Sequence, residues 1–121
     1  HYYNITNRNY LSFSKTASKL HLDQPIIQNI DEFIVSPRFS LIIKRENIQK
    51  AIILGTSMGV EVGRWFDDVP PSWGMEYSKV FGSTNALRIS GTIINLPCHW
   101  TLSEEEITRI DEFIHKVSLI E

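Results

Sequence analysis

The sequence predicts an α+β fold: a small three-stranded sheet, antiparallel or mixed, with helices packed on it. Three observations lead to this prediction. Apolar residues recur at helical spacing in some segments, and they alternate or run together, as in strands, in others. The chain has 121 residues, 42% of them hydrophobic, which suits one domain with a modest core. We therefore expect residues 1–121 to form a single domain.

The N-terminal part of the chain reads as a frayed segment followed by a helix. Residues 1–9 are polar, and we expect them to be frayed. Residues 10–22 place apolar side chains at helical spacing, with Lys15 and Lys19 on the polar side. The apolar members of this predicted helix are Tyr10, Leu11, Phe13, Ala17 and Leu20. Asp-Gln-Pro at 23–25 ends the helix.

The sheet and its helices are expected in residues 33–118. Alternating apolar residues predict the longest strand over 33–44, with Pro37 marking an edge or a bulge. A second helix follows over 46–58, and Gly59 is suited to the left-handed position just past its end. Residues 60–66 then alternate as a second strand.

A loop and a short helix separate the second strand from the third. Residues 67–79 are rich in Asp, Pro and Gly and hold two aromatic residues, Trp73 and Tyr77. We expect the short helix over 84–90. The apolar run 93–96 reads as a buried strand that Pro97 ends.

The last helix has a strong start signal. Ser103 is a good N-cap, and Glu106 stands at the position that completes a capping box. Beyond the cap, one apolar stripe is formed by Ile107, Ile110, Phe113, Ile114 and Val117. Three glutamates, 104–106, lie at the positive end of the helix dipole, which they complement.

From Gly59 onward the chain also resembles a known family. Residues 59–66 read Gly-Val-Glu-Val-Gly-Arg-Trp-Phe, similar to a family motif Gly-Ile-Glu-x-Gly-x-Trp/Tyr. Residues 83–106 then carry Ala86 in the short helix, Leu-Pro-x-His at the end of a strand and Leu-Ser-x-Glu-Glu at the start of the last helix. These motifs, in this order, resemble the end of the DegT/StrS-type nucleotide-sugar aminotransferases, which depend on pyridoxal phosphate.

The resemblance implies a role within a larger enzyme. The chain would be the C-terminal small domain of a fold-type I aminotransferase that moves an amino group from an amino donor to a keto-sugar nucleotide. A large domain would hold pyridoxal phosphate, and the parent enzyme would be a homodimer. The family's Schiff-base lysine precedes a Gly-Glu-Gly-Gly turn, and neither Lys15 nor Lys19 does. We therefore expect no catalytic residue and no bound cofactor in this chain alone.

The same resemblance implies a wall of the substrate pocket. In the family, the loop after the Gly-Ile-Glu-x-Gly-x-Trp segment closes over the sugar nucleotide. The residues that correspond here are Arg64, Trp65, Phe66, Trp73 and Tyr77. A guanidinium can pair with a diphosphate, and aromatic rings can stack on a sugar or a base. The chain departs from the family in having Ser83-Thr84 in place of Cys-Pro, and no His in this loop.

Other chemistries find little support in the sequence. No two of the four histidines have a ligand spacing on one predicted helix, so we expect no metal site. His99 is expected to hydrogen-bond at the start of the last helix. Cys98, the one cysteine, reads as a small buried residue rather than a nucleophile, and a single cysteine favours a reducing compartment such as the cytoplasm. The net charge of −2 gives no bulk attraction to nucleic acid or to an acidic membrane.

A second hypothesis remains open. The chain has no convincing catalytic group and carries an aromatic loop between a strand and a helix. It is therefore also compatible with a free-standing, non-catalytic domain that binds a small ligand or a partner protein.

Overall fold

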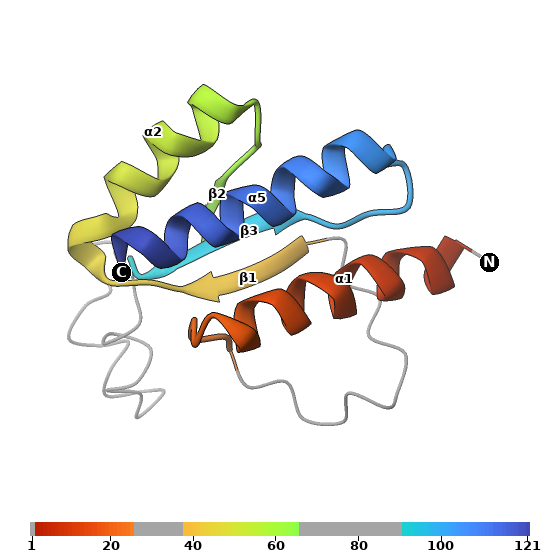
Figure 1. Cartoon of the computed structure of the whole chain (residues 1–121), viewed down its shortest axis with the longest axis horizontal. Helices are drawn as coiled ribbons and strands as arrows, with labels where there is room; N and C mark the ends of the chain where they lie inside the picture. The colour runs from red at the N-terminus through yellow and green to blue at the C-terminus, as the bar shows by residue number, and fades with distance from the viewer. Residues whose placement is uncertain (1, 26–37, 66–90) are drawn as a thin grey trace, which may run out of the picture.

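A computed structural model of the protein describes residues 2–25, 38–65 and 91–121 (Figure 1). The elements in these ranges are α1 (Tyr2–Lys19), β1 (Arg38–Ile42), the short 3-10 helix η1 (Arg45–Asn47), α2 (Ile48–Met58), β2 (Gly63–Trp65), β3 (Ile93–Pro97) and α5 (Glu104–Ile120). The α+β fold is confirmed. None of the helices in the described part of the chain has the length and apolar character of a membrane span.

The three strands form one antiparallel sheet in the order β1-β3-β2. Strand β3 is central, and all five of its residues are buried, which confirms the predicted buried strand. Leu96 pairs with Phe39 of β1, and Asn95 pairs with Gly63 of β2. Of the two predicted arrangements, antiparallel and mixed, the antiparallel one is therefore observed.

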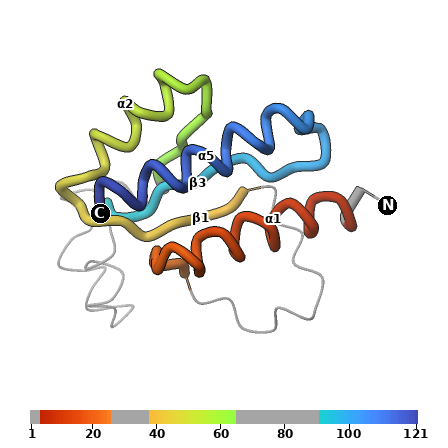
Figure 2. The backbone as a smooth tube through the Cα atoms, viewed as in Figure 1, coloured from red at the N-terminus to blue at the C-terminus, as the bar shows by residue number. Residues whose placement is uncertain are grey.

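The helices cover one face of this sheet, which we call the inner face. Helix α5 packs against both α1 and α2, and α1 also contacts β1 (Figure 1). The backbone trace shows α5 running along β3, with α2 on one side of it and α1 on the other (Figure 2). The fully buried side chains of the inner face and of the helices above it include Phe13, Phe39, Leu41, Ile94, Leu96, Phe113 and Ile114.

Helix α1 begins well before residue 10, so the expectation of a frayed segment over residues 1–9 was wrong. The polar residues of its first turns are part of the packing. Thr6 and Asn9 are buried, and the Asn9 side chain donates to the carbonyl oxygens of Cys98, at 3.3 Å, and His99, at 3.4 Å. A polarity pattern misses such a helix, because it cannot show that the buried Asn9 is paired with backbone from a distant segment.

Helices α1 and α2 end in the same way. The backbone N–H of Leu22 donates to Ala17 while His21 takes a left-handed conformation, with φ of 58°. In α2 the N–H of Val60 donates to Gly55, and the left-handed residue is Gly59, as predicted. Both ends satisfy carbonyl groups that would otherwise lack partners.

The second strand is shorter than the predicted range 60–66, because its first residues serve the end of α2. The N–H of Val60 is used by the helix end, so pairing with β3 starts only at Gly63. A Cβ on Gly55 would overlap Val62 and lie 3.1 Å from the Val60 oxygen. Gly55 therefore permits the close approach of this segment to α2, which compensates for its low helix propensity.

The other predicted elements differ from the observed ones mainly in their bounds. Strand β1 covers 38–42 of the predicted 33–44, and the predicted second helix is divided into η1 and α2. The start of α5 is confirmed, since the Ser103 hydroxyl accepts a hydrogen bond of 3.1 Å from the Glu106 N–H. Residues 33–37 and the predicted short helix 84–90 lie outside the described residues.

Candidate functional site

The residues predicted to line a substrate pocket begin on strand β2. Arg64 is exposed on this strand and stands opposite Ile94 of β3. For Trp65 the structure describes the backbone, which pairs with Ile93. The Trp65 side chain and the predicted residues Phe66, Trp73 and Tyr77 lie outside what the structure describes. Among the five predicted pocket residues, Arg64 is therefore the one for which the structure describes both backbone and side chain.

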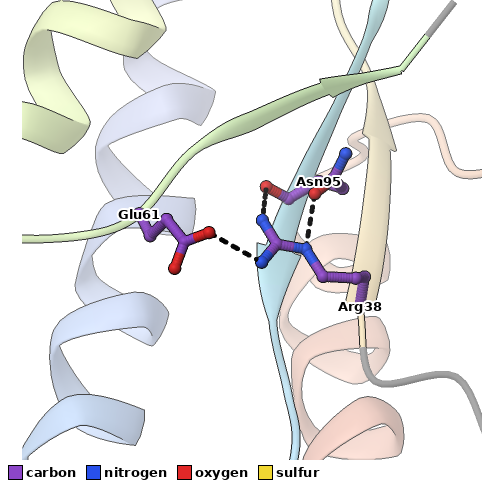
Figure 3. Close-up of polar contacts among 3 residues, drawn as sticks. All are labelled: Arg38, Glu61 and Asn95. Atoms are coloured by element: carbon purple, nitrogen blue, oxygen red, sulfur yellow. Dashed lines mark hydrogen bonds and ion pairs between the residues drawn. The ribbon is translucent and has the colours of Figure 1, made fainter.

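A polar cluster lies directly beside this strand, on the outer face of the sheet, which is opposite the helices. Its centre is Arg38, at the start of β1, whose Nε donates to Asn95 Oδ1 at 2.5 Å and whose Nη2 donates to the Asn95 carbonyl oxygen at 3.3 Å. The Nη1 of Arg38 donates to Glu61 Oε1 at 3.1 Å. Figure 3 shows the guanidinium between the other two side chains. One arginine thus joins β1, β3 and the segment that leads into β2.

The two contacts of Arg38 differ in environment. Asn95 is only 2% exposed, so its hydrogen bonds to Arg38 are shielded from water. The Glu61 side chain is 76% exposed, and an ion pair of that kind contributes about 0.2–1 kcal/mol. The contact with Asn95 is therefore the stronger determinant of where the guanidinium lies.

The amide of Asn95 is oriented by Arg38. Because Nε is a donor, the amide oxygen must face it, and the amide nitrogen points away (Figure 3). That nitrogen is buried, and within the described ranges it has no hydrogen-bond partner. Burying an unpaired donor costs about 1–3 kcal/mol. An asparagine at this position is thus explained by its acceptor oxygen and not by a complete set of hydrogen bonds.

Gly63, the first residue of β2, lies against this cluster. A Cβ at this position would overlap Asn95 Oδ1 and would lie 3.0 Å from Arg38 Nη2. The backbone of β2 therefore lies directly against the polar side chains, with no room for a larger residue. Arg64 is the next residue in the strand, so it is directly bonded to the residue that contacts the cluster.

Sequence reasoning did not identify this cluster, although one signal was present. Asn95 interrupts the apolar run 93–96, which was predicted to be a buried strand. A polar residue inside a buried strand requires a partner. The identity of that partner, Arg38, is set by strand pairing across 57 residues of chain, which local patterns do not reveal.

A pocket of about 270 Å³ opens beside the cluster, between the segment before β2 and the start of α5. It has a mixed lining with two carboxylates, one guanidinium and one imidazole. The lining residues are Gly59, Val60, Glu61, Pro97, His99, Leu102, Glu106, Arg109 and Ile110. Arg109 also pairs with Glu105 at 2.9 Å, one helical turn before it. The pocket is thus suited to a small polar molecule rather than to an apolar one.

Two residues considered from the sequence have structural roles here. The Nδ1 atom of His99 lies 2.5 Å from Thr101 Oγ1, and its carbonyl accepts from the Leu102 N–H, so His99 hydrogen-bonds before α5 as expected. Cys98 is fully buried, and burial raises the pKa of its thiol to about 12, although the Arg38 charge opposes this shift. A protonated thiol is a poor nucleophile. Across residues 2–25, 38–65 and 91–121, no three His, Cys, Asp or Glu side chains are grouped to hold a metal ion.

Pyridoxal phosphate does not fit the pocket described above. The cofactor requires a lysine for its Schiff base and donors for its phosphate. The pocket is lined by Glu61 and Glu106 and by no lysine, and these carboxylates would repel a phosphate. The lysines of α1, Lys15 and Lys19, are exposed on the surface of that helix. This pocket therefore does not suit the cofactor.

Comparison with solved structures identifies proteins of similar fold. NtdA from Bacillus subtilis, solved with the cofactor PMP bound, matches with a TM-score of 0.66 and 15% sequence identity. PseC from Helicobacter pylori, an aminotransferase involved in the biosynthesis of pseudoaminic acid, matches with a TM-score of 0.64 and 13% identity. Each match covers 98% of this chain.

The matches cover only a part of these proteins, namely 28% of NtdA and 33% of PseC. No protein-family model matches the chain, and no curated protein matches it in sequence. At these identities the likeness concerns the fold. The resemblance expected from the motifs is thus confirmed at that level: this chain folds like about one third of a PLP-dependent aminotransferase.

Proposed function

We propose that this chain is the C-terminal domain of a PLP-dependent aminotransferase that acts on keto-sugar nucleotides. The domain contributes a wall of the substrate pocket, and a large domain supplies the cofactor and the Schiff-base lysine. The observation that carries this proposal is the fold, which PseC and NtdA share over 98% of the chain. The motif order from Gly59 to Glu106 supports it independently.

In this proposal Arg64 binds the diphosphate of the sugar nucleotide. Arg64 is exposed on β2. It precedes the predicted loop 67–79, whose aromatic residues Trp73 and Tyr77 would stack on the sugar or the base. A guanidinium can hold a diphosphate with two parallel hydrogen bonds, which a lysine cannot reproduce. The parent enzyme would be a homodimer, and its amino donor would bind beside the cofactor.

The proposal is tested with the native protein expressed from its full coding sequence. We expect that sequence to extend upstream of His1 and to encode a lysine that forms a Schiff base with pyridoxal phosphate. Borohydride reduction should fix the cofactor to that lysine, and peptide mapping should locate it. A protein that neither binds pyridoxal phosphate nor transfers an amino group to any keto-sugar nucleotide would refute the proposal.

The role of Arg64 is tested by substitution in the same protein. We expect Arg64→Ala to raise the KM for the sugar nucleotide roughly ten- to hundredfold, because one charge-assisted contact is lost. The KM for the amino donor should stay unchanged. The matched control is Arg8→Ala, which removes an exposed arginine from α1. Equal effects of the two substitutions would exclude Arg64 from the pocket.

A free-standing ligand-binding domain is the second candidate. It is favoured by the pocket of about 270 Å³, which is formed by this chain alone. Calorimetric titration of the isolated chain with small polar metabolites would support it if a ligand binds and Glu106→Gln weakens that binding. A coding sequence that contains the cofactor domain would favour the aminotransferase instead.

A further inference from the structure

Within the described residues, strand β2 comprises Gly63–Trp65 and carries Arg64. It pairs with β3 on one edge alone, since β3 is its only neighbour in the described sheet. A strand segment that pairs on one side gains a fixed position from further contacts. The polar cluster on the outer face supplies them.

Arg38 contacts two residues that neighbour Gly63, the first residue of β2: one across the sheet and one earlier in the chain. Asn95, which Arg38 orients, stands opposite Gly63, and Glu61 precedes Gly63 by two positions. The guanidinium therefore fixes the residue that faces Gly63 and also the segment that leads into it (Figure 3). The lack of space for a Cβ on Gly63 shows that the strand and the cluster are in direct contact.

We propose that Arg38 is a positioning residue: through Asn95, Gly63 and Glu61 it fixes the segment 61–65 and thereby the place of Arg64 in the substrate pocket. This inference rests on the proposed function. Arg38 does not need to touch the substrate for this role. Its effect is transmitted by three hydrogen bonds and one close backbone contact.

The role requires an arginine. The planar guanidinium donates at the same time from Nε, Nη1 and Nη2 to acceptors that lie in different directions. A lysine has a single nitrogen and reaches at most some of these acceptors. Arg38→Lys therefore keeps the charge while it removes the geometry, which makes it the informative substitution.

The first experiment measures hydrogen exchange of backbone amides in the native protein by mass spectrometry. We expect Arg38→Lys to speed exchange at least tenfold in the peptide that contains residues 61–65. Exchange in the peptide of α5 should stay unchanged, because α5 packs on the inner face. The matched control is Arg8→Lys, on the surface of α1. A uniform increase across both peptides, or no change in either, would overturn the inference.

The second experiment measures steady-state kinetics of the same variants. Arg38→Lys should raise the KM for the sugar nucleotide at least fivefold, while kcat and the KM for the amino donor change less than twofold. A loosened segment 61–65 with an unchanged KM would overturn the positioning role. If no sugar nucleotide is a substrate, the proposed function fails, whereas the exchange pattern still decides whether Arg38 fixes the strand.

A steric variant provides an independent route should Arg38→Lys fold poorly. Gly63→Ala places a Cβ against Asn95 and Arg38, and it should loosen segment 61–65 by the same measure. Asn95→Ala in the same chain removes the Asn95 atoms that would clash, but it also removes the side-chain acceptor of Arg38. The double variant should therefore speed exchange by less than the product of the two single effects. Additive effects of the two substitutions would show that Gly63 and Asn95 do not act together, which would overturn the inference.

Discussion

The central strand β3 is buried on both faces of the sheet, but its neighbours on the two faces differ in chemistry. On the inner face, Ile94 and Leu96 of β3 are fully buried against the helices. On the outer face, Asn95 of the same strand is 2% exposed and bonded to Arg38. Adjacent residues of one strand therefore lie in an apolar core and in a polar cluster.

The difference shows which face contributes stability and which contributes geometry. Apolar burial is non-directional and scales with area, so the inner face stabilises the fold without demanding one arrangement. Hydrogen bonds to a guanidinium are directional, so they favour one arrangement of the donor and its acceptors. We infer that the inner face holds the domain together and the outer face holds β2 in place.

The largest effect is expected from the inner face. Ile94→Ala removes a fully buried side chain and leaves a cavity beneath the helices, which should lower the free energy of unfolding by about 2–5 kcal/mol. Urea denaturation measures this loss. A change below about 1 kcal/mol would mean that the inner face is not the main source of stability.

An effect of intermediate size is expected at Cys98, where burial and the charge of Arg38 act against each other. Burial raises the pKa of the thiol from 9.0 to about 12, so the unfolded chain loses this proton first as pH rises. The contribution of the protonated Cys98 thiol to the free energy of unfolding is therefore fully present below pH 9. It is lost between pH 9 and pH 12, by up to about 1.4 kcal/mol for each pH unit.

Denaturation at a series of pH values measures this dependence. Burial also raises the pKa of Tyr10 above its ordinary 10.0, which gives a slope of the same sign at higher pH. We therefore expect Cys98→Ala to flatten the curve chiefly just above pH 9, and the Cys98 thiol of the folded protein to resist alkylation at pH 8. Rapid alkylation of the folded protein would contradict this account.

A smaller effect on stability is expected at Asn95. Replacing Asn95 by Leu removes the side-chain bond to Arg38, but it also removes the buried amide nitrogen, which has no partner among the described residues. These two changes oppose each other, so the free energy of unfolding should change by less than about 1.5 kcal/mol. Urea denaturation of Asn95→Leu and Ile94→Ala under the same conditions compares the two losses of unfolding free energy directly. A loss as large as that of Ile94→Ala would erase the distinction between the two faces.

The smallest effect is expected at Glu61. Glu61→Gln keeps an acceptor oxygen for Arg38 but removes a charge that is largely in water. We expect a loss below about 0.5 kcal/mol that disappears at high salt concentration. Thermal denaturation at two ionic strengths measures it. A loss that does not depend on salt would mean that the pair is more shielded than its exposure indicates.

Much of the fold was determined by the sequence itself. The cap at Ser103, the left-handed Gly59 and the alternation around Phe39 and Leu41 are local signals, and the structure confirms each of them. Local signals succeed here because capping and strand alternation depend on residues within a few positions of one another. The motifs from Gly59 onward likewise indicate the aminotransferase-like fold from the sequence alone.

The tertiary structure decided what depends on distant partners. Asn9 holds the N-terminal half of α1 against the carbonyls that follow β3, and the end of α2 determines where β2 begins. The cluster of Arg38, Glu61 and Asn95 exists because antiparallel pairing brings three separate segments together. A hydrogen bond between segments leaves no periodic pattern in either one, so only the folded arrangement reveals it.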